Sequence, residues 1–394
     1  MFGVAAWVTV AGLPTAAPDV VTSLEHPFTG WPGENLLDLI FSPLAKWDSL
    51  HYLSIAYDGY VGGHSGLTDP AMRPAFFPLY PGIVRVLSGF AASPGLLLIV
   101  AYAVSLACFF AALVLLHRLT TIEIGERYAR PTLLLLCFFP TSFFFGIPYS
   151  ESLFLLLAVA AFLAARTGRW AIAGAVLALA SATRAPGLLL IVPVALLYLY
   201  GPRADREPAT AGGLLPRYPI RRNLAWLSLA PLGFLAYCVY LHYAVGDALA
   251  WSHAQSLFGR HTVDPLTGMW AGVREAGKAI WHVGHGTYRG TYDYLNIGQL
   301  AFVAFAVVGG IGALRVLPPA YGVWVLVSLV PIFMAEHPSF PFYSSMRFVA
   351  VLFPLFLWLA IHCERRGATT TVVAVFAAGM AVLAAQFTLW SFVA

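Results

Sequence analysis

Apolar segments of roughly the length that crosses a lipid bilayer recur along the whole of this sequence. A transmembrane helix needs about 20 mostly apolar residues, or somewhat fewer when neighbouring helices bury it. The chain is 60% hydrophobic and 10% charged, whereas a soluble domain carries about 25% charged residues. About eleven windows qualify: 1–18, 95–117, 131–147, 151–165, 170–183, 186–201, 224–244, 294–314, 318–335, 347–362 and 369–391. The sequence therefore predicts an all-α polytopic membrane protein.

Two apolar segments leave the number of crossings open. The first window, 1–18, has no basic residues ahead of its apolar run, so we interpret it as a retained span rather than a cleaved leader. The segment 76–90 contains Pro78 and Pro81 and carries Arg85. These residues favour a re-entrant or interfacial helix over a crossing one.

Lysine and arginine indicate the orientation, because cytoplasmic loops carry an excess of both. With the N-terminus inside and 76–90 not crossing, 13 of the 22 basic residues fall on the cytoplasmic side, mostly in short loops. Those loops are 118–130, 166–169, 202–223, the short connection that contains Arg315, and 363–367. Two long segments, 19–94 and 245–293, then lie on the non-cytoplasmic side.

Both long outer segments are predicted to be structured. Segment 245–293 is rich in tryptophan and tyrosine and is amphipathic around 269–283, which predicts helices lying on the membrane surface. No internal repeat divides the sequence. We therefore expect a single domain over residues 1–394 that carries both outer loops.

Residues 46–60 concentrate charge and aromatic side chains in a chain that otherwise avoids charge. The side chains of interest are Trp47, Asp48, His51, Tyr52 and Asp58. The run is helix-like, with Gly59 where a C-terminal cap would lie. Asp48 has two interpretations: it caps the N-terminus of a helix, or it is a functional carboxylate at the membrane boundary.

Three further charged residues are predicted at the same outer boundary. Glu151 begins an apolar segment, so it is either a helix cap or a site residue. Arg184 lies between two apolar segments, where an arginine is costly unless it meets an anion, and this favours a functional role. For Arg347, which lies closer to water, structural and functional roles are equally open.

Other kinds of site have less support in the sequence. The four cysteines lie in apolar runs without metal-ligand spacing. His282 and His285 are three residues apart, but no HExxH pattern or carboxylate at ligand spacing accompanies them. The basic residues are spread over loops rather than gathered in a patch, so we expect no nucleic-acid partner.

Several short motifs follow one another at informative spacings. They are Trp47-Asp48-Ser49-x-His51-Tyr52-x-x-Ile55-Ala56-x-x-Gly59-Tyr60, Phe76-Phe77-Pro78-Leu79-Tyr80-Pro81, Pro140-Thr141-Ser142-Phe143-Phe144 with Tyr149-Ser150-Glu151-Ser152, Ala182-Thr183-Arg184-x-x-Gly187, and Arg347-Phe348 followed by Leu352-Phe353-Pro354-Leu355-Phe356. In order and spacing these motifs resemble the PIG-V type of mannosyltransferase, a family that has bacterial members. The resemblance covers about residues 40 to 360.

The resemblance implies a GT-C type glycosyltransferase in the plasma membrane of a bacterium. Such an enzyme takes a sugar, here mannose, from a polyprenyl-phosphate donor. It passes the sugar to a glycolipid or lipid-linked glycan acceptor on the non-cytoplasmic face. In this class an acidic residue of the first outer loop is the usual catalytic base, and Asp48 matches that position. Asp58 belongs to the same motif and is expected to support substrate binding.

The chemistry of such a transfer gives expected roles to the remaining candidates. Arg184 and Arg347 are candidates for the donor phosphate, because guanidinium groups pair bidentately with phosphate oxygens. The candidates for holding sugar or acceptor are Trp47, His51, Tyr52, Tyr80 and Glu151. Outer loop 245–293 is expected to shape donor and acceptor binding. No cofactor or metal is implied with certainty, and a divalent cation stays open.

Two other functions fit part of the same pattern. A lipid or glycolipid transporter would share the apolar spans and a boundary arginine, but repeat-like halves and mid-span charges, which are typical of transporters, are not evident. A non-catalytic subunit of a larger transferase would fit if Asp48 were dispensable.

Overall fold

The computed structural model of the protein describes residues 40–62, 68–90, 93–209, 215–389 and 391–393. The expected first span, 1–18, and the start of outer loop 19–94 lie outside these residues. The described helices are α4 (Asp48–Asp58), α5 (Leu79–Leu87), α6 (Pro94–Ile124), α7 (Ala129–Cys137), α8 (Glu151–Arg166), α9 (Trp170–Ser181), α10 (Ile191–Tyr200), α11 (Leu232–Val245), α12 (Ala250–His253), α13 (Pro265–Gly284), α14 (Thr291–Val316), α15 (Pro319–Met334), α16 (Ser345–Ala350), α17 (Pro354–Arg366) and α18 (Thr369–Thr388).

Shorter elements connect these helices. The 3-10 helices are η1 (Ser42–Leu44), η2 (Pro70–Ala75), η3 (Glu126–Tyr128), η4 (Ser142–Gly146), η5 (Ala185–Leu190), η6 (Arg222–Leu229) and η7 (Ala254–Phe258). Two strands of two residues each, β1 (His261–Thr262) and β2 (Ala335–Glu336), pair antiparallel. The described chain is mostly helical, as the sequence predicts.

Several helices are suited to a membrane by length and composition. Four are long and apolar enough to cross: Pro94–Ile124, Arg222–Val245, Thr291–Val316 and Thr369–Thr388. Three shorter apolar helices are Trp170–Ser181, Ala185–Tyr200 and Pro319–Met334. All seven coincide with predicted windows, which confirms where these apolar helices lie. The total of about eleven crossings stays a prediction.

Prolines divide two of the predicted spans. The window 131–147 becomes α7 and η4, with Pro140 between them. The window 347–362 becomes α16 and α17, and Pro354 begins α17. Proline has no N–H to donate and clashes with the preceding turn, so a helix cannot run through it undisturbed. The breaks place the ends of short helices among other helices.

The two segments predicted to be outer loops contain helices where the sequence pattern predicts them. The segment 76–90 forms α5, whose nine residues span only about 14 Å, too short to cross the bilayer. The expected amphipathic helix around 269–283 is α13, which begins after an Asp264 side-chain cap. Pairing of β1 with β2 ties the segment before α13 to the end of α15.

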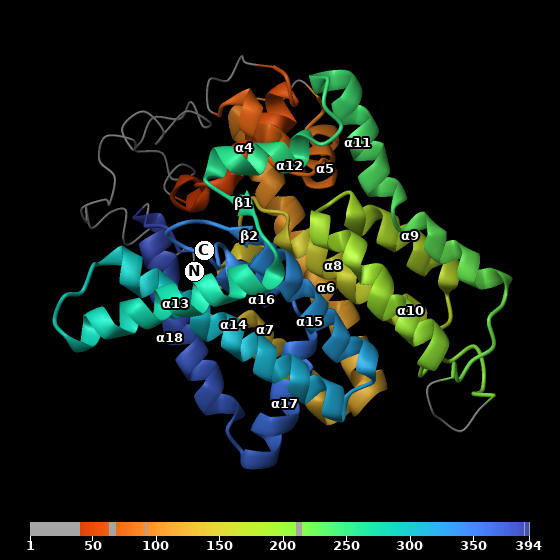
Figure 1. Cartoon of the computed structure of the whole chain (residues 1–394). Helices are drawn as coiled ribbons and strands as arrows, with labels where there is room; N and C mark the ends of the chain where they lie inside the picture. Colours follow the sequence, from red (N-terminus) through yellow and green to blue (C-terminus); the bar gives the residue numbers. More distant parts are fainter. Residues whose placement is uncertain (1–39, 63–67, 91–92, 210–214, 390, 394) are drawn as a thin grey trace.

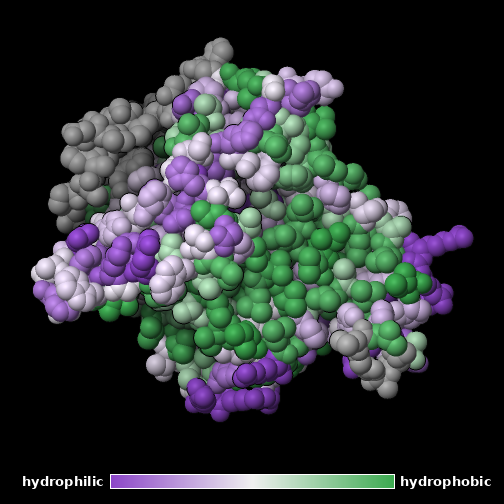
Figure 2. Space-filling view, viewed as in Figure 1, coloured by the Kyte–Doolittle hydropathy of each residue, from purple (hydrophilic) through white to green (hydrophobic). Residues whose placement is uncertain are grey.

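The arrangement separates an apolar middle from polar ends. In Figure 1, α4, α5 and α12 lie together at one end, and the turn between α17 and α18 lies at the opposite end. Figure 2 shows a broad apolar band across the middle of this face, with hydrophilic residues gathered towards the ends. Exposed apolar side chains such as Ile172, Leu179 and Val308 are the kind of surface that lipid covers.

Gly187 allows η5 to pack closely against the end of α9. A Cβ atom at this position would overlap the carbonyl oxygen of Ala180. The Gly187 N–H donates to the carbonyl of Arg184 at 2.9 Å. The glycine of the Arg184-x-x-Gly187 motif therefore helps to fix the backbone that carries Arg184.

We expect Gly187→Ala to destabilise the protein by about 1–3 kcal/mol, because the added methyl group forces η5 away from α9. Thermal unfolding in detergent measures the effect. Gly82→Ala in α5 is the matched control, since a Cβ atom there meets nothing within 4 Å. Equal unfolding temperatures for Gly187→Ala and the unmodified protein would show that this close approach is unimportant.

Candidate active site

Four charged side chains from distant segments meet in one group, which we call the ion-pair cluster. Its members are Asp48 at the start of α4, Glu151 at the start of α8, Arg184 just before η5 and Arg347 in α16. Arg347 Nη1 donates to Asp48 Oδ2 at 2.6 Å, and Arg347 Nε lies 3.0 Å from Glu151 Oε1. Arg184 Nη1 donates to the same Glu151 oxygen at 2.5 Å.

Charge balance allows this cluster to be buried. Two carboxylates and two guanidinium groups sum to zero, and an unpaired charge in such a place would cost several kcal/mol. The exposed fraction of the side chain is 1% for Glu151 and 5% for Arg347, but 27% for Asp48. Asp48 is therefore the more accessible of the two carboxylates.

Asp48 and Glu151 both begin helices, as the sequence predicts, but neither carboxylate occupies the N-cap position. Trp47 occupies the N-cap position of α4 and Ser150 that of α8, so Asp48 and Glu151 are the first helical residues. Their carboxylates extend to the arginines instead. Each still benefits from the positive end of its helix dipole.

Unusual backbone conformations precede both partners of the central ion pair. Trp47, directly before Asp48, has φ 57° and ψ −119°, and Ser344, three residues before Arg347, has φ 62°. Left-handed φ values are uncommon for residues other than glycine, and they persist only where surrounding contacts hold them. The Trp47 ring packs edge-on against Phe392, with centroids 5.5 Å apart.

Aromatic rings line the guanidinium groups. Arg347 Cζ lies 5.2 Å from the ring centroid of Tyr149 and 5.1 Å from that of Phe348. Arg184 Cζ lies 4.6 Å from the Phe348 ring. The Tyr149 hydroxyl accepts from the Asp48 N–H at 3.2 Å and donates to the Lys46 carbonyl at 3.1 Å. Tyr149 thus fixes the start of α4 beside Arg347.

The electrostatics of α4 favour an ionised Asp48 and a neutral His51. Burial raises the pKa of Asp48, but the charge and hydrogen bond of Arg347, together with the charges of neighbouring basic residues, lower it below the usual 3.8. Burial lowers the pKa of His51 to about 4, although Asp48 opposes the shift. The His51 ring stacks on Phe76 with centroids 4.5 Å apart.

Two predicted tyrosines are packed rather than open. The Tyr52 hydroxyl hydrogen-bonds with Ser150 Oγ at 2.7 Å, next to Glu151. Tyr80 is fully buried, and its hydroxyl donates to the Ala101 carbonyl at 3.0 Å. The Tyr80 ring therefore supports Tyr52, whose centroid is 5.2 Å away, instead of offering a free face to a sugar.

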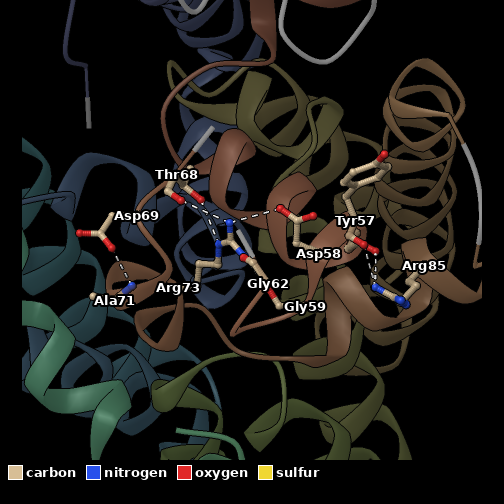
Figure 3. A network of polar contacts seen from close by, with 10 residues as sticks. Tyr57, Asp58, Gly59, Gly62, Thr68, Asp69, Ala71, Arg73 and Arg85 are labelled. Atoms are coloured by element: carbon tan, nitrogen blue, oxygen red, sulfur yellow. Dashed lines mark hydrogen bonds and ion pairs between the residues drawn. The ribbon is translucent and has the colours of Figure 1, made fainter. Parts of the chain in front are cut away.

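Asp58 lies in a separate network at the other end of α4 (Figure 3). Its carboxylate is 3.4 Å from Nη2 of Arg73, a fully buried residue. Arg73 also donates to the carbonyls of Gly59, Gly62 and Thr68. The Arg85 guanidinium donates to the carbonyls of Ala56 and Tyr57 and so caps the end of α4. Asp58 thus holds the loop after α4 and is not part of the ion-pair cluster.

Arg260 is a charged residue near the cluster that sequence reasoning missed. It lies in outer loop 245–293, where no family motif falls, and it has no neighbouring pattern that would have marked it. Its contacts with Tyr343 bring it close to α16. Among the described residues, no three His, Cys, Asp or Glu side chains are grouped to hold a metal ion.

Fold and site together define an integral membrane protein with a buried, charge-balanced cluster that includes one accessible carboxylate. A family model described as Mannosyltransferase (PIG-V) matches residues 23–198. Over these residues the chain is similar to the PIG-V mannosyltransferases, the family that its motifs resemble. The matched region contains Asp48, Glu151 and Arg184 but not Arg347.

Curated mannosyltransferases are also similar to this chain in sequence, over part of their length. GPI alpha-1,6-mannosyltransferase 2 of Rattus norvegicus is 32% identical over 167 residues. The proteins of the same name from Cricetulus griseus and Homo sapiens are 30% and 29% identical over 166 residues each. Each alignment covers 40% of this chain and 32% of the relative. The match thus spans about a third of the relatives' length.

Solved structures give a weaker likeness. A crystal structure of the Archaeoglobus fulgidus oligosaccharyltransferase aligns over 100% of this chain and 55% of its own, with a TM-score of 0.46 and 14% identity. The same archaeal protein in complex with an inhibitory peptide and a dolichol-phosphate gives a TM-score of 0.44. Scores of this size do not establish a common fold.

Proposed function

We propose that the protein is a GT-C type mannosyltransferase that moves mannose from polyprenyl-phosphate-mannose to a glycolipid or lipid-linked glycan acceptor. The PIG-V relationship supports the class of reaction. The observation that carries the proposal is the accessible Asp48 carboxylate, held by Arg347 within a cluster of two arginines and two acids. Such a group can take a proton beside cations that favour a departing phosphate.

The proposed step is a single displacement at the anomeric carbon. An acceptor hydroxyl attacks that carbon while its proton passes to Asp48. The bond between the anomeric carbon and the phosphate oxygen breaks, and its electron pair leaves with polyprenyl phosphate. Because attack and departure occur on opposite faces of the sugar, the anomeric configuration inverts.

Each member of the cluster has a proposed part in this step. Arg347 holds Asp48 in its ionised form and in one orientation, as its hydrogen bond and its effect on the Asp48 pKa support. Arg184 is more exposed than Arg347 and would meet the donor phosphate together with it. Glu151 Oε2 is buried with no hydrogen-bond partner among the described residues. This carboxylate oxygen could accept a hydrogen bond from a sugar hydroxyl.

Residues around the cluster would complete the substrate site. His51, neutral at physiological pH, would hydrogen-bond an acceptor or sugar hydroxyl, and its Nδ1 is buried without a partner among the described residues. Trp47 would offer a ring face, and Tyr52 would support Glu151 through Ser150. We further propose that the site faces the non-cytoplasmic side of the membrane, because the loop charges favour that orientation.

Asp48→Asn tests the proposed base. We expect transfer from polyprenyl-phosphate-mannose to fall by about 100- to 10,000-fold, because the amide cannot accept the proton. The measurement is mannose transfer by purified protein in detergent to a panel of glycolipid acceptors. The matched control is Asp247→Asn, which alters an exposed carboxylate in the other outer loop.

Near-normal transfer by Asp48→Asn would remove Asp48 as the base. The absence of any transfer by the unmodified protein, with every acceptor, would favour a transporter or a non-catalytic subunit. NMR of the product gives a second check, because a β-linked donor should yield an α-linked product.

The rate of transfer should depend little on pH between about 8 and 5.5. A base must be ionised, and because the pKa of Asp48 is lowered, activity is retained above that pKa and declines only as pH falls through it. His51, with a pKa of about 4, stays neutral over the same range. The measurement is kcat/KM in overlapping buffers. A decline centred near pH 6.5 that His51→Gln removes would contradict this account.

A further inference from the structure

Arg260 connects outer loop 245–293 to the ion-pair cluster. It follows η7 and directly precedes β1. Its guanidinium carbon lies 4.3 Å from the centroid of the Tyr343 ring, and Nη1 donates to Gln255 Oε1 at 2.9 Å. Tyr343 is four residues before Arg347, so the contact brings the two arginines to the same part of the molecule.

The backbone on both sides of Arg260 is fixed against the site. Two residues earlier, the Phe258 ring packs edge-on against His51, with centroids 5.6 Å apart. On the other side, His261 pairs with Glu336 in the short β1–β2 ladder. Figure 1 shows β1 and β2 between α4 and α16, which carry Asp48 and Arg347. The position of Arg260 is therefore set by the fold rather than by a loose loop.

In the described part of the chain, no acid in direct contact balances the charge of Arg260. No carboxylate among the described residues lies within ion-pair distance of it, whereas Arg184 and Arg347 are both paired. Its Nε is buried without a hydrogen-bond partner in the described part of the chain. The residue as a whole is half-buried, so part of its surface remains accessible.

The charge of Arg260 also affects the pKa of Asp48, the proposed base. Burial raises the pKa of Asp48, Arg347 lowers it most, and Arg260 adds a smaller lowering effect. Together, the ion-pair cluster and Arg260 contain three arginines and two carboxylates. This set of five side chains therefore has one positive charge in excess.

The departing phosphate gains negative charge during the proposed transfer, and an excess of positive charge in the site would stabilise it. The phosphate of the donor carries one negative charge as a diester and approaches two as the glycosidic bond breaks. The four-residue cluster alone is neutral and offers that growing charge little net attraction. A third guanidinium group can form charge-assisted hydrogen bonds that strengthen as the phosphate departs.

We propose that Arg260 binds the phosphate of the polyprenyl-phosphate donor and stabilises it as the leaving group. This proposal rests on the proposed function, and it assigns outer loop 245–293 a direct part in donor binding. It makes Arg260 a ligand of the substrate, whereas Arg347 chiefly holds Asp48.

Inhibition by a short product analogue tests the proposal. Farnesyl phosphate carries the charged group, and farnesol is its neutral counterpart. In Arg260→Met, which keeps an apolar stem against Tyr343, we expect inhibition by farnesyl phosphate to weaken about 10- to 100-fold. Inhibition by farnesol should be unchanged. Arg260→Lys should recover part of the affinity for farnesyl phosphate, because it restores the charge without the planar fork.

Two controls separate charge from folding. Arg274→Met removes an exposed arginine from α13 of the same outer loop and should leave both inhibitors unaffected. Thermal unfolding of each variant reports on stability.

Unchanged inhibition by farnesyl phosphate in Arg260→Met, or a loss shared equally with farnesol or with Arg274→Met, would overturn the proposal. If one of these contrary results appears while Asp48→Asn still abolishes transfer, only the proposed role of Arg260 is refuted. If Asp48→Asn is active, the proposed function itself is refuted.

Discussion

The structure around the site depends on one buried guanidinium group, that of Arg347. It lies between the carboxylates of Asp48 and Glu151 and is almost completely removed from solvent. Such a charge is tolerated only when acids and further hydrogen bonds compensate it. Because Asp48 is 299 residues away in the sequence, this requirement fixes α4 against the C-terminal half of the chain.

Two helix starts make this meeting possible. The first turn of a helix presents free N–H groups and a positive dipole end. α4 and α8 start beside Arg347, each with a carboxylate as its first residue. The left-handed conformations of Trp47 and Ser344 are held next to the same ion pair. Sites of function often concentrate strain of this kind, at a cost of about 1–3 kcal/mol per residue.

The sequence predicts the helices and the members of the cluster better than their contacts. Apolar windows locate seven membrane-suited helices because hydrophobicity is a local property. Asp48, Glu151, Arg184 and Arg347 are predicted at one boundary because the order of the apolar segments and the loop charges puts them on the same side. The pairing of Arg347 with Asp48 rather than with water depends on contacts across hundreds of residues, which no local pattern contains. For the same reason, the burial of Tyr80, the attachment of Asp58 to Arg73 and the proximity of Arg260 were not predicted.

The most direct test of Asp48 as the base is an experimental structure of the Asp48→Asn variant with polyprenyl-phosphate-mannose bound. We expect the anomeric carbon of mannose to lie close to residue 48, with space for an acceptor hydroxyl between them. We also expect the phosphate oxygens to lie within hydrogen-bonding distance of one or more of Arg184, Arg260 and Arg347. A donor bound with its sugar and phosphate away from these residues would contradict the proposed site.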